Sequence, residues 1–262
     1  MAKRIPRISI PLRKPEEVIP HLGKKYHWRQ GYSAKAVADS WFLANDVPLK
    51  VRSVLNQNEQ FLNAPLIDAW LERSTDLQDG RGSHSQTDLL AILGLGDSIA
   101  VCGVEAKVNE SFGALVGDWL TEANDGKQQR LTKLCNLFGI SQEEAKPLRY
   151  QLLHRTAAQI YEAQRYRTSS AIMMVHSFSD KSTGLNDFTA FAKALGFQGA
   201  GLDSLVGPRT FGAVDLWLGW TSDICPPPVD VLWDDLFAKL PIDDDFVAPE
   251  DLPPQERDFG FD

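Results

Sequence analysis

The stretch TDLLAILGLGDSIAVCGVEAK, residues 87–107, decides the fold. Two apolar runs flank the tetrapeptide Gly94-Leu-Gly-Asp97, a pattern that is typical of a β-hairpin with a glycine-rich turn. Both runs are apolar on both faces apart from a few charged positions, which predicts strands at the centre of a sheet covered on each side. The stretch therefore favours an α/β layer architecture.

The hydrophobic pattern around the hairpin predicts further elements. Upstream we expect a helix capped by Ser33 with Val37, Trp41 and Ala44 on one face, a short helix over residues 48–55, and a third helix over about 65–73 with Leu66, Ala69 and Trp70 inward. Residues 74–85 are polar and predict a loop. Downstream we expect helices over 113–123, 127–138, 143–165 and 186–195, and strands over 171–178 and 211–220.

Charge and composition divide the chain of 262 residues into three parts. Residues 1–35 hold nine Lys and Arg against two Glu, whereas residues 222–262 hold twelve Asp and Glu against two basic residues, so the formal net charge of −8 belongs largely to the C-terminal end. We expect an irregular basic arm over residues 1–32, an α/β domain over 33–222 and an acidic, proline-rich tail over 223–262. Its scattered aromatic residues make this tail a candidate docking segment for a partner protein.

The composition also excludes several classes of protein. With 43% hydrophobic and 24% charged residues the chain is typical of globular proteins. No apolar run is long enough to span a membrane, and the basic N-terminal segment precedes no apolar core of a signal peptide. The three cysteines match no zinc or redox spacing, which indicates reduced thiols. We therefore expect a cytoplasmic protein.

The register of the hairpin determines which polar side chains can meet. A turn that is symmetric about Leu95 and Gly96 would pair Leu93 with Ser98 and Asp88 with Gly103. Because residues two apart on a strand share a face, Asp88 would then lie on the same face as Glu105 and Lys107, as a diagonal neighbour of Glu105. We also expect Gly103 to allow the close approach of another backbone or a ligand.

Two carboxylates and a lysine in an apolar sheet are costly to bury unless they pair with one another or bind a metal ion. Mg²⁺ prefers one or two carboxylates together with water and phosphate oxygens. Asp88, Glu105 and Lys107 therefore indicate a metal-dependent site for phosphodiester chemistry. The alternative is a strand end with an ordinary surface ion pair.

Asp88, followed after sixteen residues by Glu105-Ala106-Lys107, resembles the signature of the PD-(D/E)xK nuclease superfamily, although Thr87 replaces its customary proline. The resemblance covers about residues 64–178. It implies a restriction-endonuclease-like core of three layers, with a central mixed sheet flanked by helices. It also implies that Asp88 and Glu105 bind Mg²⁺ or Mn²⁺ and that Lys107 orients or activates the attacking water.

Two further positions fit this resemblance. Glu72, on the helix expected before the hairpin, resembles an additional acidic residue of the exonuclease-like members and would be a third metal ligand. Gln151, on the polar side of the long helix, resembles the glutamine that flanks their active site. Arg155 stands where a tyrosine is usual, and its guanidinium could hold a phosphate through two hydrogen bonds.

The resemblance implies a Mg²⁺-dependent deoxyribonuclease, of a kind that often serves bacterial restriction, repair or defence. DNA would be gripped by local cations, namely Lys107, Lys127, Arg130, Lys133, Arg149 and Arg155, with the basic arm as an added clamp. Two alternatives remain open. One is a non-catalytic module that retains the fold and binds nucleic acid or protein, and the other is a hydrolase of small phosphorylated compounds.

Overall fold

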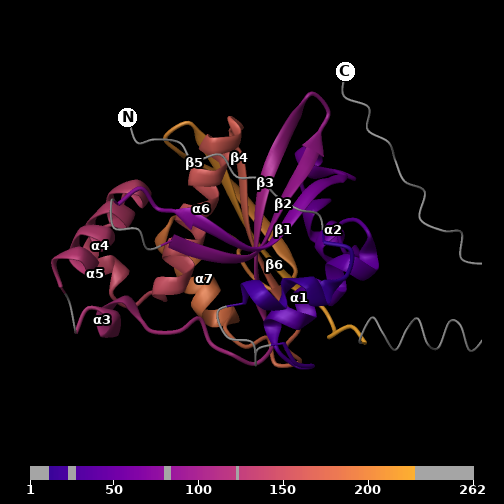
Figure 1. The fold of residues 1–262 in the computed structure, drawn as a ribbon. Coiled ribbons are helices and arrows are strands. Elements are labelled where there is room, and N and C mark those ends of the chain that lie inside the picture. Colours follow the sequence, from indigo (N-terminus) through magenta and orange to yellow (C-terminus); the bar gives the residue numbers. More distant parts are fainter. Residues whose placement is uncertain (1–11, 23–27, 80–83, 122–123, 228–262) are drawn as a thin grey trace, which may run out of the picture. The chain divides into compact units, whose positions relative to one another are not determined.

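A six-stranded mixed sheet organises the fold (Figure 1). The structure is a computed structural model that describes residues 12–22, 28–79, 84–121 and 124–227. In spatial order the strands are β1 (Leu66–Asp76), β2 (His84–Leu95), β3 (Ser98–Lys107), β4 (Ser170–Ser177), β6 (Val214–Ser222) and β5 (Ser204–Phe211). The first three strands form an antiparallel meander, β3, β4 and β6 are parallel, and β5 is antiparallel to β6. The α/β class with a mixed sheet is thereby confirmed.

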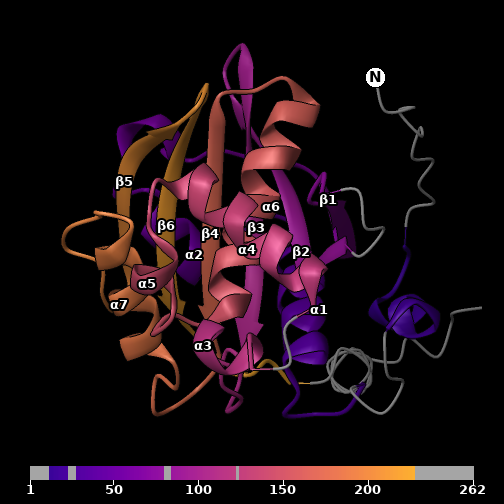
Figure 2. The same cartoon turned by 90° about the vertical axis from the view of Figure 1, so that its left-hand side faces the viewer.

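Helices cover both faces of this sheet (Figure 1, Figure 2). One face carries α4 (Asp125–Phe138), α5 (Gln142–Ala145), α6 (Tyr150–Tyr166) and α7 (Leu185–Ala194), and the other carries α1 (Ser33–Ala44) and α2 (Leu49–Leu55). A large apolar cluster lies beneath α6, and a second one lies beneath α1 and α2. The sheet is therefore buried on both sides, as the apolar hairpin predicts.

The hairpin turns one residue later than expected, which shifts the pairing of the two strands by two residues. Leu95 pairs with Ser98 across a two-residue turn, and Gly96 adopts a φ of 63°, which a glycine tolerates without strain. Leu90 rather than Asp88 therefore lies opposite Gly103. Because the shift is an even number of residues, the paired residues keep the faces that the expected register assigned to them.

The helix expected over 65–73 is wrong, since these residues belong to β1. The register of β1 shifts between Leu66 and Asp68, so Leu66 and Ala69 both pack on the cluster beneath α1 and α2 although they are three residues apart. Strands interrupted in this way mimic the helical i, i+3 spacing. The loop expected over 74–85 is also shorter, because β1 continues to Asp76 and β2 begins at His84.

Other elements differ in their limits. The long helix expected over 143–165 is divided into α5 and α6 on either side of Pro147, which has no backbone N–H to donate to a helical hydrogen bond. The helix expected over 113–123 is reduced to α3 (Val116–Trp119). Ser33 begins α1 without capping it, and Ala44 is exposed. Strand β5 was not expected at all, whereas α2, α4, α7 and β4 lie close to their predicted ranges.

Part of the basic arm that was expected before the domain is ordered. Within the basic arm, Pro15–His21 form the 3-10 helix η1, whose Val18 is buried, so this part is not irregular. A second short 3-10 helix, η3 (Glu59–Phe61), follows α2. The acidic tail lies outside the described residues from position 228 onward. Among the residues described, no helix is long and apolar enough to cross a membrane.

Candidate active site

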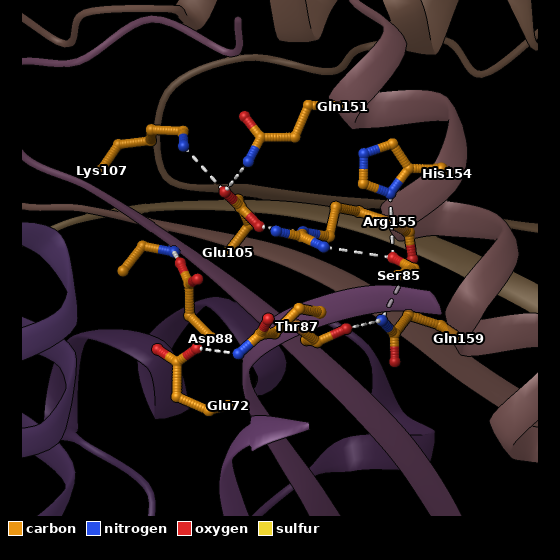
Figure 3. A network of polar contacts seen from close by, with 12 residues as sticks. Glu72, Ser85, Thr87, Asp88, Glu105, Lys107, Gln151, His154, Arg155 and Gln159 are labelled. Carbon is orange, nitrogen blue, oxygen red and sulfur yellow. Dashed lines mark hydrogen bonds and ion pairs between the residues drawn. The ribbon is translucent and has the colours of Figure 1, made fainter. Parts of the chain in front are cut away.

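Glu105, near the end of β3, is the centre of a buried polar network (Figure 3). Its Oε1 accepts hydrogen bonds from Lys107 Nζ at 2.7 Å and from Gln151 Nε2 at 2.6 Å, and its Oε2 accepts one from Arg155 Nε at 2.6 Å. The Glu105 side chain is 2% exposed. The structure thus brings together the predicted carboxylate, lysine, glutamine and arginine from β3 and α6.

Asp88 lies where the pairing of β2 with β3 ends. The last pair is Leu89 with Val104, and Asp88 Oδ2 instead accepts a hydrogen bond from the Ala106 backbone N–H at 2.8 Å. On the N-terminal side of Asp88, the faces of the sheet to which successive β2 side chains point are reversed. Leu89 packs beneath α1 and α2, yet Thr87 reaches the α6 side chain of Gln159. The carboxylate of Asp88 therefore approaches Glu105 through an interruption of the strand, not through the regular alternation expected from the sequence.

The charges of these groups perturb one another. Burial and the neighbouring charge of Glu105 raise the pKa of Asp88 to about 8. Burial alone would also raise the pKa of Glu105, but the positive charges of Arg155 and Lys107 outweigh it and lower this pKa to about 2. Burial opposes the charge of Lys107, yet Glu105 and Asp88 hold its pKa above the usual value, so Lys107 is an ammonium group. The site therefore combines a carboxylate that stays ionised, Glu105, with a second carboxyl group that resists ionisation, Asp88.

Glu72 lies on β1 and not on a helix as expected. The pairs Leu71 with Leu89 and Arg73 with Thr87 bracket Glu72 and Asp88, which places these two residues in the same row of the sheet. Glu72 has a φ of 53°, which is rare for a residue with a side chain and is often found at functional sites. Its Oε2 accepts a hydrogen bond from Gln86, and burial raises its pKa.

Three acidic residues do not, however, form a metal cluster. Within the described ranges, no group of three or more His, Cys, Asp or Glu residues is arranged to hold a metal ion. Glu72 as a third ligand stays a prediction, and its Oε2 accepts a hydrogen bond from Gln86 Nε2. Asp88 and Glu105 remain as the candidate pair of ligands.

Arg155 is positioned by further polar residues that the sequence analysis did not place at the site, namely Ser85, Thr87, His154 and Gln159. Its Nη1 donates to Ser85 Oγ at 3.2 Å, and Ser85 Oγ lies 2.9 Å from His154 Nδ1. Gln159 donates to Thr87 Oγ1 at 3.2 Å and to the Arg155 backbone oxygen at 3.1 Å. The sequence contains one indication that Gln159 belongs to the site, because Gln151, Arg155 and Gln159 recur every four residues along one side of α6.

The glycine at position 103 is explained by one of these residues, Gln159. A Cβ atom at this position would lie 1.9 Å from Cδ of Gln159. The close approach expected at Gly103 is therefore made by a side chain of α6.

The network opens into a cleft with a volume of about 430 Å³. Asp88, Glu105, Lys107, Gln151 and His154 line it, together with residues 110–114, Ser33, Trp119 and Tyr150. Trp119 and Tyr150 stack with ring centroids 3.9 Å apart, and the Lys127 ammonium lies over the Trp119 ring. One wall of the cleft is thus aromatic, while its polar groups come from the Glu105 network.

The other cations expected to grip DNA are each engaged within the protein. Lys127 donates to the Trp119 carbonyl, Lys133 donates to the Gln78 carbonyl, Arg130 pairs with Asp79, and Arg149 pairs with Asp187 at 2.9 Å and donates to the Gly113 carbonyl. They therefore stabilise the fold around the cleft, and a phosphate would have to compete with these contacts.

Comparison with known proteins identifies a family but no relative of known activity. A family model described as a domain of unknown function, DUF6946, matches residues 11–224, and the chain belongs to this family. No curated protein and no solved structure matches the sequence. Any statement about function must therefore be based on the geometry of the site.

Proposed function

We propose that this protein is a metal-dependent nuclease of the PD-(D/E)xK type that hydrolyses DNA phosphodiester bonds. The observation that carries the proposal is the convergence of Lys107 and Gln151 on one oxygen of Glu105, beside Asp88 and in the lining of one cleft. A buried ammonium group, an amide donor and two carboxylates that open into one cleft are the groups needed to bind and polarise a phosphodiester.

The order of elements supports a restriction-endonuclease-like core. The resemblance implies a helix, a three-stranded meander, a crossing helix and a further strand. Here β1, β2 and β3 form an antiparallel meander, α6 crosses the sheet, and β4 pairs in parallel with β3. The strand before β2, which the sequence did not indicate, is β1. The position of Glu105 and Lys107 at the carboxyl end of a central strand also agrees with this architecture.

The chemistry of the donor set fits a divalent cation. Asp88 Oδ1 has no hydrogen-bond partner among the described residues, and Glu105 Oε2 accepts only from Arg155. A carboxylate offers about four acceptor positions, so both residues retain capacity for a ligand. Asp88 and Glu105 would hold Mg²⁺ or Mn²⁺, which when bound would polarise the phosphate and lower the pKa of a water molecule.

The remaining side chains would position the substrate. Lys107, whose ammonium is buried beside Glu105, would donate to the attacking water or to a non-bridging phosphate oxygen. Gln151 would keep Glu105 in one rotamer through its hydrogen bond to Oε1. Each group is held by β3 or α6, so the site is preorganised by rigid elements.

The test compares isosteric variants with matched surface controls. Asp88→Asn preserves shape and can still accept the hydrogen bond of Ala106, so the protein should fold. It should lose Mn²⁺-dependent cleavage of plasmid and single-stranded DNA by about 100-fold or more, as should Lys107→Met. The surface variants Glu143→Gln and Lys146→Met make the same chemical changes at an exposed pair and should cleave normally. Unchanged cleavage by either site variant would contradict the assignment.

A second candidate is a non-catalytic module that binds nucleic acid or protein. The observation in its favour is that Glu105 is already neutralised by two internal cations, Lys107 and Arg155. Such a module would bind DNA equally well with and without Mn²⁺, and Asp88→Asn would leave that binding unchanged. Binding measurements on these two proteins therefore separate the candidates.

A further inference from the structure

Arg155 occupies the oxygen of Glu105 that neither Lys107 nor Gln151 uses. Its Nε lies 2.6 Å from Oε2, and its side chain is 12% exposed. Arg155 belongs to α6, which packs against the face of the sheet over β3. Lys107, in contrast, belongs to the same strand as Glu105. Arg155 is therefore a cation that a different layer of the fold contributes to Glu105 (Figure 3).

A metal ion held by Glu105 and Asp88 would lie close to this guanidinium. Both cations would contact the same carboxylate, and like charges a few ångströms apart in a partly buried site repel strongly. Metal binding is consequently opposed for as long as Arg155 stays on Glu105. A phosphate in the cleft offers the guanidinium another partner, since arginine binds phosphate oxygens through two parallel hydrogen bonds.

We propose that Arg155 couples metal binding to substrate binding by exchanging Glu105 for a phosphate of the nucleic acid. Without substrate, Arg155 remains on Glu105 and keeps metal affinity low. With substrate, the guanidinium turns to the phosphate and the carboxylate is released for the metal. This inference rests on the proposed function and adds a form of regulation to the same site, because futile metal binding is suppressed until nucleic acid enters.

The contacts of Arg155 permit such an exchange. Its backbone oxygen is held by Gln159, and within the described part of the chain its Nη1 bonds only the small hydroxyl of Ser85, so the guanidinium can move while α6 stays in place. Reciprocity then requires that metal and nucleic acid raise each other's affinity by the same factor. Couplings of this kind are commonly about 5- to 150-fold.

The experiment measures Mn²⁺ affinity by the electron paramagnetic resonance signal of free Mn²⁺, without any turnover. The full chain is titrated with and without a short oligothymidylate whose linkages are phosphorothioates. In the unaltered protein the oligonucleotide should tighten Mn²⁺ binding by about tenfold. In Arg155→Met, Mn²⁺ alone should bind about tenfold more tightly and the effect of the oligonucleotide should fall below about threefold.

Two further variants control for charge and folding. Arg155→Lys keeps the positive charge but loses the Nε hydrogen bond, so its Mn²⁺ affinity should be intermediate; it also carries the test if Arg155→Met does not fold. Lys146→Met removes an exposed positive charge elsewhere and should match the unaltered protein.

The outcomes distinguish this proposal from the proposed function. If Arg155→Met and Arg155→Lys bind Mn²⁺ as the unaltered protein does, with the same dependence on the oligonucleotide, the coupling role is refuted and the nuclease proposal stands. If Mn²⁺ binds none of the proteins, with or without oligonucleotide, both proposals fail. If Mn²⁺ binds Arg155→Met in the absence of the oligonucleotide but binds the unaltered protein only in its presence, the coupling is established.

Discussion

Gly103→Ala should be among the most damaging substitutions of a single methyl group in this protein. The new Cβ would lie 1.9 Å from Cδ of Gln159 and 2.1 Å from its Nε2, whereas ordinary contacts of a Cβ begin near 3.4 Å. Gln159 is 1% exposed and packed against β2, so its amide has no solvent to enter. The amide must therefore leave its position, or α6 must move away from the sheet.

The cost can be worked out from the contacts that would be lost. Displacing Gln159 breaks its hydrogen bonds to Thr87 and to the Arg155 carbonyl, each worth about 1 kcal/mol net. Overpacking a buried site adds about 1–3 kcal/mol. Alanine returns about 0.5–1 kcal/mol, because it is less flexible than glycine in the unfolded chain. We expect a net loss of about 2–4 kcal/mol.

Urea unfolding of Gly103→Ala, Gln159→Ala and the double variant measures this coupling. In the Gln159→Ala background the new methyl group meets no amide, so Gly103→Ala should cost less than about 1 kcal/mol there. Because α6 also carries Gln151 and Arg155, the single variant should lose the proposed nuclease activity, and the double variant should regain part of it. Equal costs in the two backgrounds would show that Gln159 is not what Gly103 accommodates.

Three other perturbations test the charges and the packing around the site. Burial and the positive charge of Arg155 lower the pKa of His154 to about 3. The unfolded chain takes up this proton near pH 6.5 and the folded protein does not, so stability is lost as the pH falls below about 6.5, and His154→Gln should remove about 1–2 kcal/mol of the loss between pH 7 and pH 5, measured by urea unfolding. Arg73→Leu should cost about 3–5 kcal/mol because it removes the cation that pairs with the buried carboxylate of Glu162, and adding Glu162→Leu should recover most of it; a double variant as unstable as the single one would contradict this. Deletion of residues 241–262, which lie outside the described part of the chain, should raise DNA affinity at low salt without lowering the melting temperature, whereas a lower melting temperature would mean that the tail packs with the domain.

The α/β class could be predicted from the hairpin because its two apolar runs leave little choice of environment. Strand β1 could not, and the reason is local. The register shift near Leu66 places residues three apart on one face, so periodicity favours a helix where the chain forms a strand. The break at Glu72 reverses the faces a second time, since Arg73 and Thr75 both bond Glu162 on α6. A strand with two such irregularities has no alternation to detect.

The position of Asp88 illustrates what a register argument can and cannot provide. An error of two residues in the pairing leaves the face of every paired residue unchanged, so Gly103 and Glu105 were correctly assigned to one common face, which is the face that α6 covers. Asp88, however, lies one residue beyond the last pair, where its carboxylate accepts the Ala106 N–H. It comes near Glu105 because the ladder stops there, and no periodic pattern encodes that interruption.

The cations show a different limit of sequence reasoning. Arg149 finds Asp187 and Arg130 finds Asp79, partners that are remote in the chain and are brought close only by packing between layers. Counting local positive charges therefore overestimates the surface that is open to a phosphate backbone. Among the described cations that were expected to bind DNA, Lys107 and Arg155 are the two beside the candidate metal ligands, and both are already bound to Glu105. A phosphate that binds these two cations therefore changes the ion pairs of Glu105, and with them the affinity of Glu105 for a metal ion. Metal affinity, measured with and without nucleic acid, tests this link directly.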